Sequence, residues 1–202
     1  ENMPLFITVF HFETLNKIKS EIDEHFPYKV VHLDRAEADD VIAVLAKQWT
    51  RDDKVLILSG DKDFMQLQKY DNVKQYSPVQ KKFLRVDNPQ EFLFEHIVRG
   101  DTGDGIPNCL SKDSTFVSGD RQTPITKKRL TEWMQKGKVD YKNGDVGFDR
   151  NQRLIDFDYI PEDLVKDIVR VFEDAPASDR RFLFPYFVDK RLSKLMEHIT
   201  EF

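Results

Sequence analysis

The sequence has little of what marks secreted, zinc-binding or membrane proteins. Its 202 residues include a single cysteine, Cys109, which has no partner for an internal disulfide and favours a reducing, cytoplasmic setting. The five histidines lack the spacing of a zinc site, so zinc is not expected. No apolar run approaches the ~18 residues of a membrane span. The apolar stretch 4–12 is short and lacks a basic leader, so it does not resemble a signal peptide.

The chain also lacks an excess of positive charge. With 36 acidic against 31 basic residues, its formal net charge is −5, which argues against nucleic-acid binding through overall positive charge. Hydrophobic residues make up 40% of the sequence, enough to exclude a disordered or fibrous chain and to bury a core. The length suits one large domain or two small ones.

Hydrophobic periodicity predicts an α/β protein. A helix over 12–26, a strand over 29–33, a helix over 36–49 and a strand over 55–58 together predict a right-handed βαβ unit with parallel strands. A short helix near 64–68 and an antiparallel hairpin over 73–86 follow. From residue 89 onward, we expect mostly helices. The predicted helices cover 92–99, 125–136, 149–156, 162–174, 179–187 and 189–201.

This pattern predicts two parts. Residues 1–99 would form an α/β catalytic core with a central, mostly parallel sheet and flanking helices. Residues 100–202 would form a helical region for DNA binding and the C-terminus.

Two groups of carboxylates follow the predicted strands. Glu37, Asp39 and Asp40 begin a helix, where a capping box over 34–37 is the alternative explanation for the acidic residues. Asp61 and Asp63 come directly after the strand 55–58, where capping of the short helix is the alternative. The carboxyl ends of adjacent parallel strands meet at one sheet edge, so these side chains are expected to converge. Converging carboxylates repel one another, and hard oxygen ligands favour Mg²⁺ or Mn²⁺ as the compensating cation.

A third acidic group, Asp101 and Asp104, lies in a glycine-rich segment over 100–108. An acidic turn is the simplest alternative. A calcium loop fits poorly, because ligands at alternate positions and a closing glutamate are missing.

The three groups together resemble the structure-specific 5′-nuclease family, which includes flap endonucleases and the 5′-nuclease domains of bacterial DNA polymerases. That family has a Glu-Ala-Asp-Asp element, an Asp-x-Asp after the next strand, and a Gly-Asp-x-x-Asp-Asn-Ile-Pro element that opens a helix–three-turn–helix module. The segments 69–75, 155–161 and 192–195 are most similar to the phage members of the family.

The resemblance implies a PIN/5′-nuclease-like fold and two Mg²⁺ ions, for which Mn²⁺ would substitute. Glu37, Asp39 and Asp61 would hold the first ion. Asp40, Asp63, Asp101 and Asp104 would hold or orient the second. Such a pair generates a hydroxide nucleophile and stabilises the leaving oxygen of a phosphodiester.

Two features depart from the family pattern. The family chain begins with a strand that carries another metal-ligand aspartate and continues into a helical arch, and nothing in 1–26 matches either. The chain is therefore expected to begin after the arch. The usual glycine turn after Ile106-Pro107 is replaced by a longer segment, 109–123.

A basic segment provides the candidate DNA-binding surface. Residues 121–153 contain nine Lys or Arg and four acidic residues, and a solvated helix face is the alternative explanation. Beside an acidic metal site, such a segment suits sequence-independent phosphate contacts. The candidate contact residues are Arg121, Lys127, Lys128 and Arg129.

These features predict a two-metal 5′→3′ exonuclease and flap endonuclease that acts on RNA·DNA primers and on duplex or flap DNA in phage replication. The protein would be a monomer without membrane association, in the host cytoplasm, with a single-strand-binding protein and a sliding clamp as further partners. One alternative is a nucleic-acid-binding module that is inactive because the N-terminal metal-ligand strand is absent. The other is a PIN-type ribonuclease, which would not need the 100–108 element or the helical second half.

Overall fold

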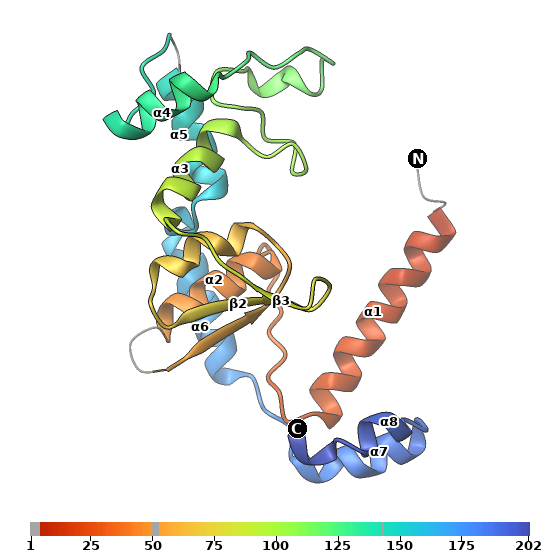
Figure 1. Cartoon of the computed structure of the whole chain (residues 1–202). Coiled ribbons are helices and arrows are strands. Elements are labelled where there is room, and N and C mark those ends of the chain that lie inside the picture. The colour runs from red at the N-terminus through yellow and green to blue at the C-terminus, as the bar shows by residue number, and fades with distance from the viewer. Residues whose placement is uncertain (1–4, 50–52, 143) are drawn as a thin grey trace. The chain divides into compact units, whose positions relative to one another are not determined.

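The computed structural model describes residues 5–49, 53–142 and 144–202 (Figure 1). In chain order the elements are α1 (Leu5–His25), α2 (Ala38–Gln48), β1 (Val55–Leu58), the 3₁₀ helix η1 (Asp63–Lys69), β2 (Val73–Ser77), β3 (Lys82–Leu84), α3 (Pro89–Arg99), η2 (Asp113–Thr115), α4 (Lys127–Lys136), α5 (Gly144–Ile155), η3 (Phe157–Tyr159), α6 (Glu162–Asp174), η4 (Arg180–Phe182), α7 (Leu183–Asp189), α8 (Ser193–Met196) and η5 (Ile199–Glu201). A small sheet among many helices confirms the predicted mixed α/β class.

The contacts divide the chain into two compact units. The first contains Glu1–Arg35 with Asp167–Phe202, and the second is Ala36–Lys166. All eleven predicted site residues lie in the second unit. The boundary near residue 100 proposed from the sequence concerns catalytic and DNA-binding roles, and it stays a prediction.

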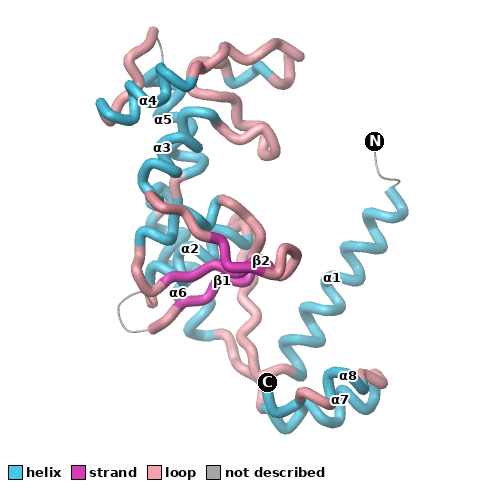
Figure 2. The backbone as a smooth tube through the Cα atoms, viewed as in Figure 1, coloured by secondary structure: helices cyan, strands magenta, loops and turns pink. Residues whose placement is uncertain are grey.

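The sheet of the second unit has the order β1-β2-β3 (Figure 2). β1 pairs in parallel with β2, and β2 pairs antiparallel with β3, which confirms the predicted hairpin. The predicted strand over 29–33 is wrong, because these residues form no regular secondary structure and pair with no described strand. The βαβ unit expected from it is therefore absent from the described residues.

One face of β1 is buried and the other is open. Ile57 packs with Ala43, Phe64 and Leu67 in the main core of this unit. Leu56 and Leu58 are 53% and 65% exposed on the opposite face. β1 and β2 are parallel, so a long connection must join them, and this connection runs through η1. η1 therefore packs against the inner face of the sheet.

A second core holds the helices that follow the sheet. Val98 of α3 packs with Cys109, Leu130 and Trp133, so the loop between α3 and α4 is tied to both helices. Burial raises the pKa of the Cys109 thiol to about 11. This loop contains the short turn η2 and is closed by Asn108, whose side chain donates to the Thr123 carbonyl at 2.9 Å.

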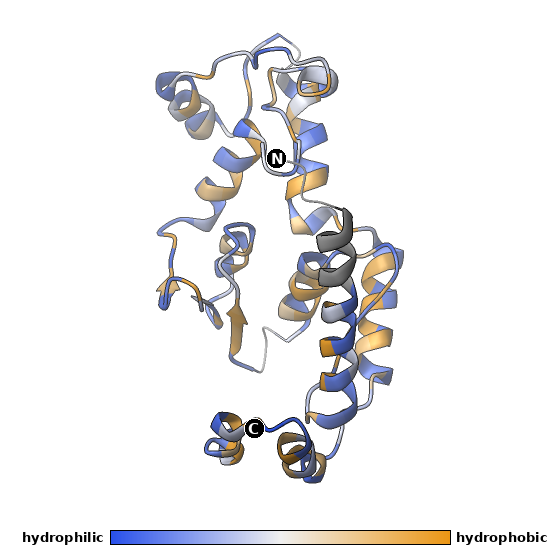
Figure 3. Cartoon of the chain, turned by 90° about the vertical axis from the view of Figure 1, so that its right-hand side faces the viewer, coloured by the Kyte–Doolittle hydropathy of each residue, from blue (hydrophilic) through white to orange (hydrophobic). Residues whose placement is uncertain are grey.

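The first unit is built around aromatic rings. Leu183, Tyr186 and Phe187 of η4–α7 form its core, and Phe26 meets Phe187 edge to face with ring centroids 5.8 Å apart. The predicted helix ending before Pro27 is confirmed as α1, although it begins earlier, at Leu5. None of the described helices is long and apolar enough to cross a membrane, and Figure 3 shows hydrophilic and hydrophobic residues mixed along the helices.

An ion-pair cluster joins three elements of the second unit. Asp158 of η3 accepts from Lys47 of α2 at 2.9 Å and from Lys69 of η1 at 2.6 Å. Burial alone would raise the pKa of Asp158, but the hydrogen bonds from the two lysines outweigh burial and lower it.

Replacing Asp158 with asparagine should therefore lower the free energy of unfolding by about 1 kcal/mol at pH 7, a modest value because the side chains are partly exposed. A carboxyl whose pKa is lowered by folding contributes stability above its unfolded value, near pH 4. That contribution is lost as the pH falls through the folded value. Urea unfolding at pH 7 and at pH 3 measures the difference, which should shrink at pH 3. An equal loss at both pH values would contradict the ion-pair account, and Asp71→Asn serves as an exposed control.

Candidate metal centre

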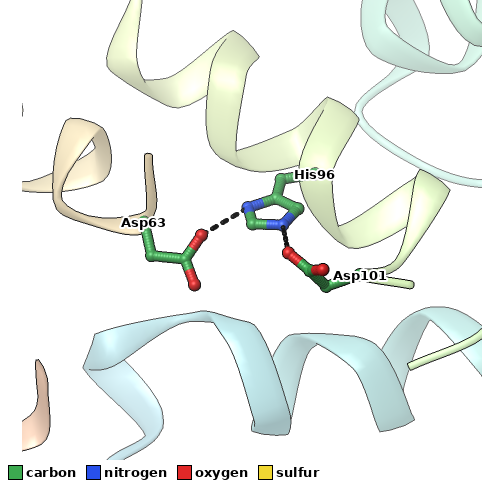
Figure 4. Close-up of side chains that lie close together, drawn as sticks. All are labelled: Asp63, His96 and Asp101. Atoms are coloured by element: carbon green, nitrogen blue, oxygen red, sulfur yellow. Dashed lines mark hydrogen bonds and ion pairs between the residues drawn. The ribbon is translucent and has the colours of Figure 1, made fainter. Parts of the chain in front are cut away.

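The strongest candidate site combines Asp63, His96 and Asp101 (Figure 4). Each offers one ligand atom, and the three atoms lie within 4.8 Å of one another. Asp63 begins η1, His96 lies in the last turn of α3, and Asp101 follows that helix. The side chains of His96 and Asp101 are buried, and that of Asp63 is 17% exposed.

Local sequence explains why these elements end where they do. Asn88 caps α3 by accepting from the backbone N–H groups of Gln90 and Glu91, and Pro89 takes the first position of the helix. Gly100 ends the helix with φ of 68°, and a Cβ there would lie 2.4 Å from the Ile106 carbonyl oxygen. Only glycine permits this close turn, which brings Asp101 back beside His96.

Asp101 is held by three donors. Its Oδ2 lies 2.6 Å from the Lys62 ammonium and 3.0 Å from His96 Nε2, and its Oδ1 accepts from the Gly103 N–H at 2.8 Å. Burial would raise the pKa of Asp101, but these hydrogen bonds hold it at about 2. Asp101 is therefore a carboxylate at all working pH values.

Asp63 has the opposite environment. Burial is the main cause that raises its pKa, to about 6; the charges of Asp61 and Asp101 also act to raise it, while His96 and Lys62 act to lower it. Its Oδ1 is 3.6 Å from His96 Nδ1, and neither of these buried atoms has a hydrogen-bond partner. The unsatisfied, buried Asp63 Oδ1 beside the Asp101 carboxylate fits a divalent cation, which would take an oxygen lone pair from each aspartate, and His96 Nδ1 faces the same Asp63 oxygen.

The second and third acidic groups of the sequence thus meet in the structure. Asp61 accepts from the Asp63 N–H at 3.0 Å, and the exposed Asp104 acts with Asp63 and Asp101 to raise the pKa of Lys62. The largest effect on Lys62 is its hydrogen bond to Asp101. Lys62 therefore supplies positive charge to this group of carboxylates.

The first acidic group lies at the start of α2 and is engaged in capping. The Glu37 N–H donates to Asp40 Oδ2 at 3.1 Å, and the Asp40 N–H donates to Asp39 Oδ1 at 3.0 Å. The capping pair is therefore Glu37 with Asp40, and the capping box over 34–37 that the sequence offered as an alternative is not the one formed. Within the described parts of the chain, Glu37, Asp39, Asp40, Asp61 and Asp104 do not join a group of three ligand atoms within 4.8 Å. Their assignment to two metal ions stays a prediction.

The candidate DNA-binding residues are all exposed. Lys127, Lys128 and Arg129 form the first turn of α4, which follows the Thr126 cap and begins at Lys127, two residues later than expected. The Arg129 guanidinium lies over the Tyr141 ring, 5.1 Å from its centroid. Arg121 lies in the loop before the helix.

Sequence reasoning missed three residues of the centre: Lys62, Gln75 and His96. Gln75 is fully buried on β2, and its amide donates to the carbonyls of Ser59 and Asp61, which fixes the loop after β1. His96 follows Phe92 by four residues and packs against its ring, so helical spacing places both on one face. That spacing was the available signal for an inward-facing histidine.

The second unit is therefore a mixed α/β unit with a carboxylate-lined centre at the end of a parallel strand, and two known families match this chain. The family described as "T4 RNase H, C terminal" matches residues 89–202, and "5′-3′ exonuclease, N-terminal resolvase-like domain" matches residues 12–95. The first match spans more than half of the chain, so the chain belongs to the T4 RNase H C-terminal family. This confirms the resemblance to 5′-nucleases.

Individual relatives agree with this membership. The ribonuclease H of enterobacteria phage T4 is 36% identical over 203 residues, a match that covers 95% of this chain and 66% of the T4 protein. The chain thus spans slightly less than two thirds of that relative.

Two solved structures are also similar to the chain. A lysine-to-alanine mutant of the T5 5′-exonuclease has a TM-score of 0.46 and 20% identity, over 69% of this chain and 67% of that one. A T5 protein co-crystallised with metal ions has a TM-score of 0.44 and 21% identity, over 69% and 61%.

Proposed function

We propose that this chain belongs to a metal-dependent nuclease that removes nucleotides 5′→3′ from RNA·DNA primers and from flap or duplex DNA during phage replication. The observation that carries the proposal is the buried Asp63–His96–Asp101 group with two unsatisfied atoms. The 36% identity to a phage ribonuclease H and the match to a 5′-3′ exonuclease family support the same reaction.

The proposed division of labour joins the Asp63–His96–Asp101 group to the other carboxylates that the resemblance to 5′-nucleases implies. Asp63 and Asp101 would hold Mg²⁺ or Mn²⁺, and Glu37, Asp39, Asp40, Asp61 and Asp104 would complete a two-ion site. When bound, such ions polarise the phosphodiester and lower the pKa of attacking water. Lys62 would offset the repulsion between the carboxylates, and Gln75 would keep the loop that carries Asp61 and Asp63 in place.

The helical part of the second unit would bind the nucleic-acid backbone. Because Lys127 and Lys128 are exposed on the first turn of α4, they would contact phosphates without reading sequence. A single-strand-binding protein, a sliding clamp, a monomeric state and the host cytoplasm belong to the same proposal.

The reaction is tested with the full-length protein and with 5′-labelled flap, nicked-duplex and RNA·DNA substrates. Release of short 5′ products in Mg²⁺, abolished by a chelator, is the expected result. Binding of these substrates without cleavage would instead favour the binding-only module. A PIN-type ribonuclease is disfavoured because the helical second half matches the T4 RNase H family.

Replacing Lys127 and Lys128 together with alanine should weaken binding to all duplexes about equally. The slope of log affinity against log salt should fall by about 2, because each phosphate contact contributes roughly one unit. Fluorescence anisotropy at several salt concentrations measures both effects. An unchanged slope would place the DNA elsewhere on the chain, and Lys17→Ala combined with Lys194→Ala, two exposed lysines of the first unit, provides a charge-matched control.

A further inference from the structure

His96 occupies an unusual position for a helix residue. Its ring lies between two carboxylates, with Nε2 3.0 Å from Asp101 Oδ2 and Nδ1 3.6 Å from Asp63 Oδ1 (Figure 4). The residue is only 7% exposed. Both ring nitrogens therefore face acids, and little of the ring reaches solvent.

The ring is fixed by its surroundings. The Phe92 ring meets it edge to face, with centroids 5.9 Å apart. α3 packs against η1, the element that begins with Asp63, and Gly100 turns the chain so that Asp101 faces the same ring. One imidazole thus lies between two carboxylates that are 38 residues apart in the sequence, hydrogen-bonded to Asp101 and 3.6 Å from Asp63.

A histidine at a metal centre can either bind the metal ion itself or orient the side chains that bind it. A ligand nitrogen must direct a lone pair at the ion. Nε2 is hydrogen-bonded to Asp101, and Nδ1, which makes no hydrogen bond, lies 3.6 Å from Asp63 Oδ1 and points at that carboxylate. Hydrogen bonds from neighbouring groups orient ligating carboxylates, and losing such a partner typically weakens metal affinity about 10- to 100-fold.

We propose that His96 is a positioning residue that holds Asp63 and Asp101 at the separation a single divalent ion requires, without binding the ion itself. This inference rests on the metal centre of the proposed function. It adds a buried imidazole to a site whose sequence motifs contain only carboxylates.

Mn²⁺ alone is the probe, and affinity is measured by electron paramagnetic resonance on the complete protein without substrate. His96→Leu should weaken Mn²⁺ binding about 10- to 100-fold. His96→Gln keeps an amide donor toward Asp101 and should restore affinity to within about threefold. His198→Gln, an exposed histidine of the first unit, should bind as the unchanged protein does.

Electron spin-echo spectroscopy of the bound Mn²⁺ decides whether His96 binds the ion or only positions Asp63 and Asp101. The expected spectrum has no directly bonded nitrogen, and a nitrogen coupling that disappears in His96→Gln would overturn the proposal. Unchanged affinity in His96→Leu would also overturn it. If His96→Leu fails to fold, His96→Gln and the spectrum of the unchanged protein still decide.

The proposal and the nuclease function fail in different ways. Tight Mn²⁺ binding with the expected variant series, but without cleavage of any substrate, would support the role of His96 and reject the reaction. Absence of Mn²⁺ binding by the unchanged protein would reject the metal centre and the role of His96 together.

Discussion

Replacing Asp101 with asparagine is expected to lower nuclease activity of the complete protein at least about a thousand-fold, or roughly 4 kcal/mol of transition-state stabilisation. Asp101 is the point where Lys62, His96 and the Gly103 N–H converge. Asparagine removes the negative charge that would hold the ion and turns one oxygen acceptor into a donor facing Lys62. Cleavage of a 5′-labelled flap in Mg²⁺, measured under single-turnover conditions, gives the rate.

The control for this prediction is Asp87→Asn, an exposed aspartate before α3 that should keep its activity. Circular dichroism and substrate binding should be unchanged in Asp101→Asn, so that the loss lies in the chemical step. Activity within tenfold of the unchanged protein would remove Asp101 from the proposed centre.

Replacing Gly147 with alanine is expected to destabilise the chain by about 3 kcal/mol. Gly147 is buried in α5, and a Cβ there would lie 1.9 Å from the carbonyl oxygen of Cys109. The neighbouring atoms are backbone and cannot move aside as a side chain would. Next to this contact, Asn151 donates to the carbonyls of Ile97 and Pro107, so α5 must approach the loop closely.

Urea unfolding followed by circular dichroism measures this loss. Asp149→Ala, at an exposed position of the same helix, controls for the higher helix propensity of alanine and should be neutral or slightly stabilising. If Gly147→Ala proves as stable as the unchanged protein, then α5 does not pack on the loop as closely as described.

Local patterns predicted the elements that depend on their own residues. The helix that ends before Pro27, the strand 55–58 and the hairpin of β2 and β3 are confirmed, because apolar spacing and turn residues act over a few positions. The strand expected over 29–33 is wrong for a nonlocal reason. The Lys29 ammonium donates to the carbonyls of Phe172 and Glu173 at the end of α6, more than 140 residues away, and none of the described strands pairs with the segment.

The candidate site was predictable only where it depends on local sequence patterns. Strand order indicated that Asp61 and Asp63 lie at a sheet edge, and the motif after α3 indicated Asp101. That α3 inserts a histidine between them depends on how the helix packs against η1, which spacing alone does not specify. The first acidic group shows the opposite case. Its motif predicted metal ligands, but its side chains accept hydrogen bonds from backbone N–H groups at the start of α2.

The burial of Cys109 has a practical consequence for chemical labelling. The chain has one thiol, it is 1% exposed, and its pKa of about 11 leaves almost no thiolate at the pH used with maleimides. The native protein should therefore remain unmodified, and a cysteine introduced at an exposed position would carry a fluorophore or spin label alone. The distances needed to follow DNA engagement are thus accessible without first replacing the native thiol.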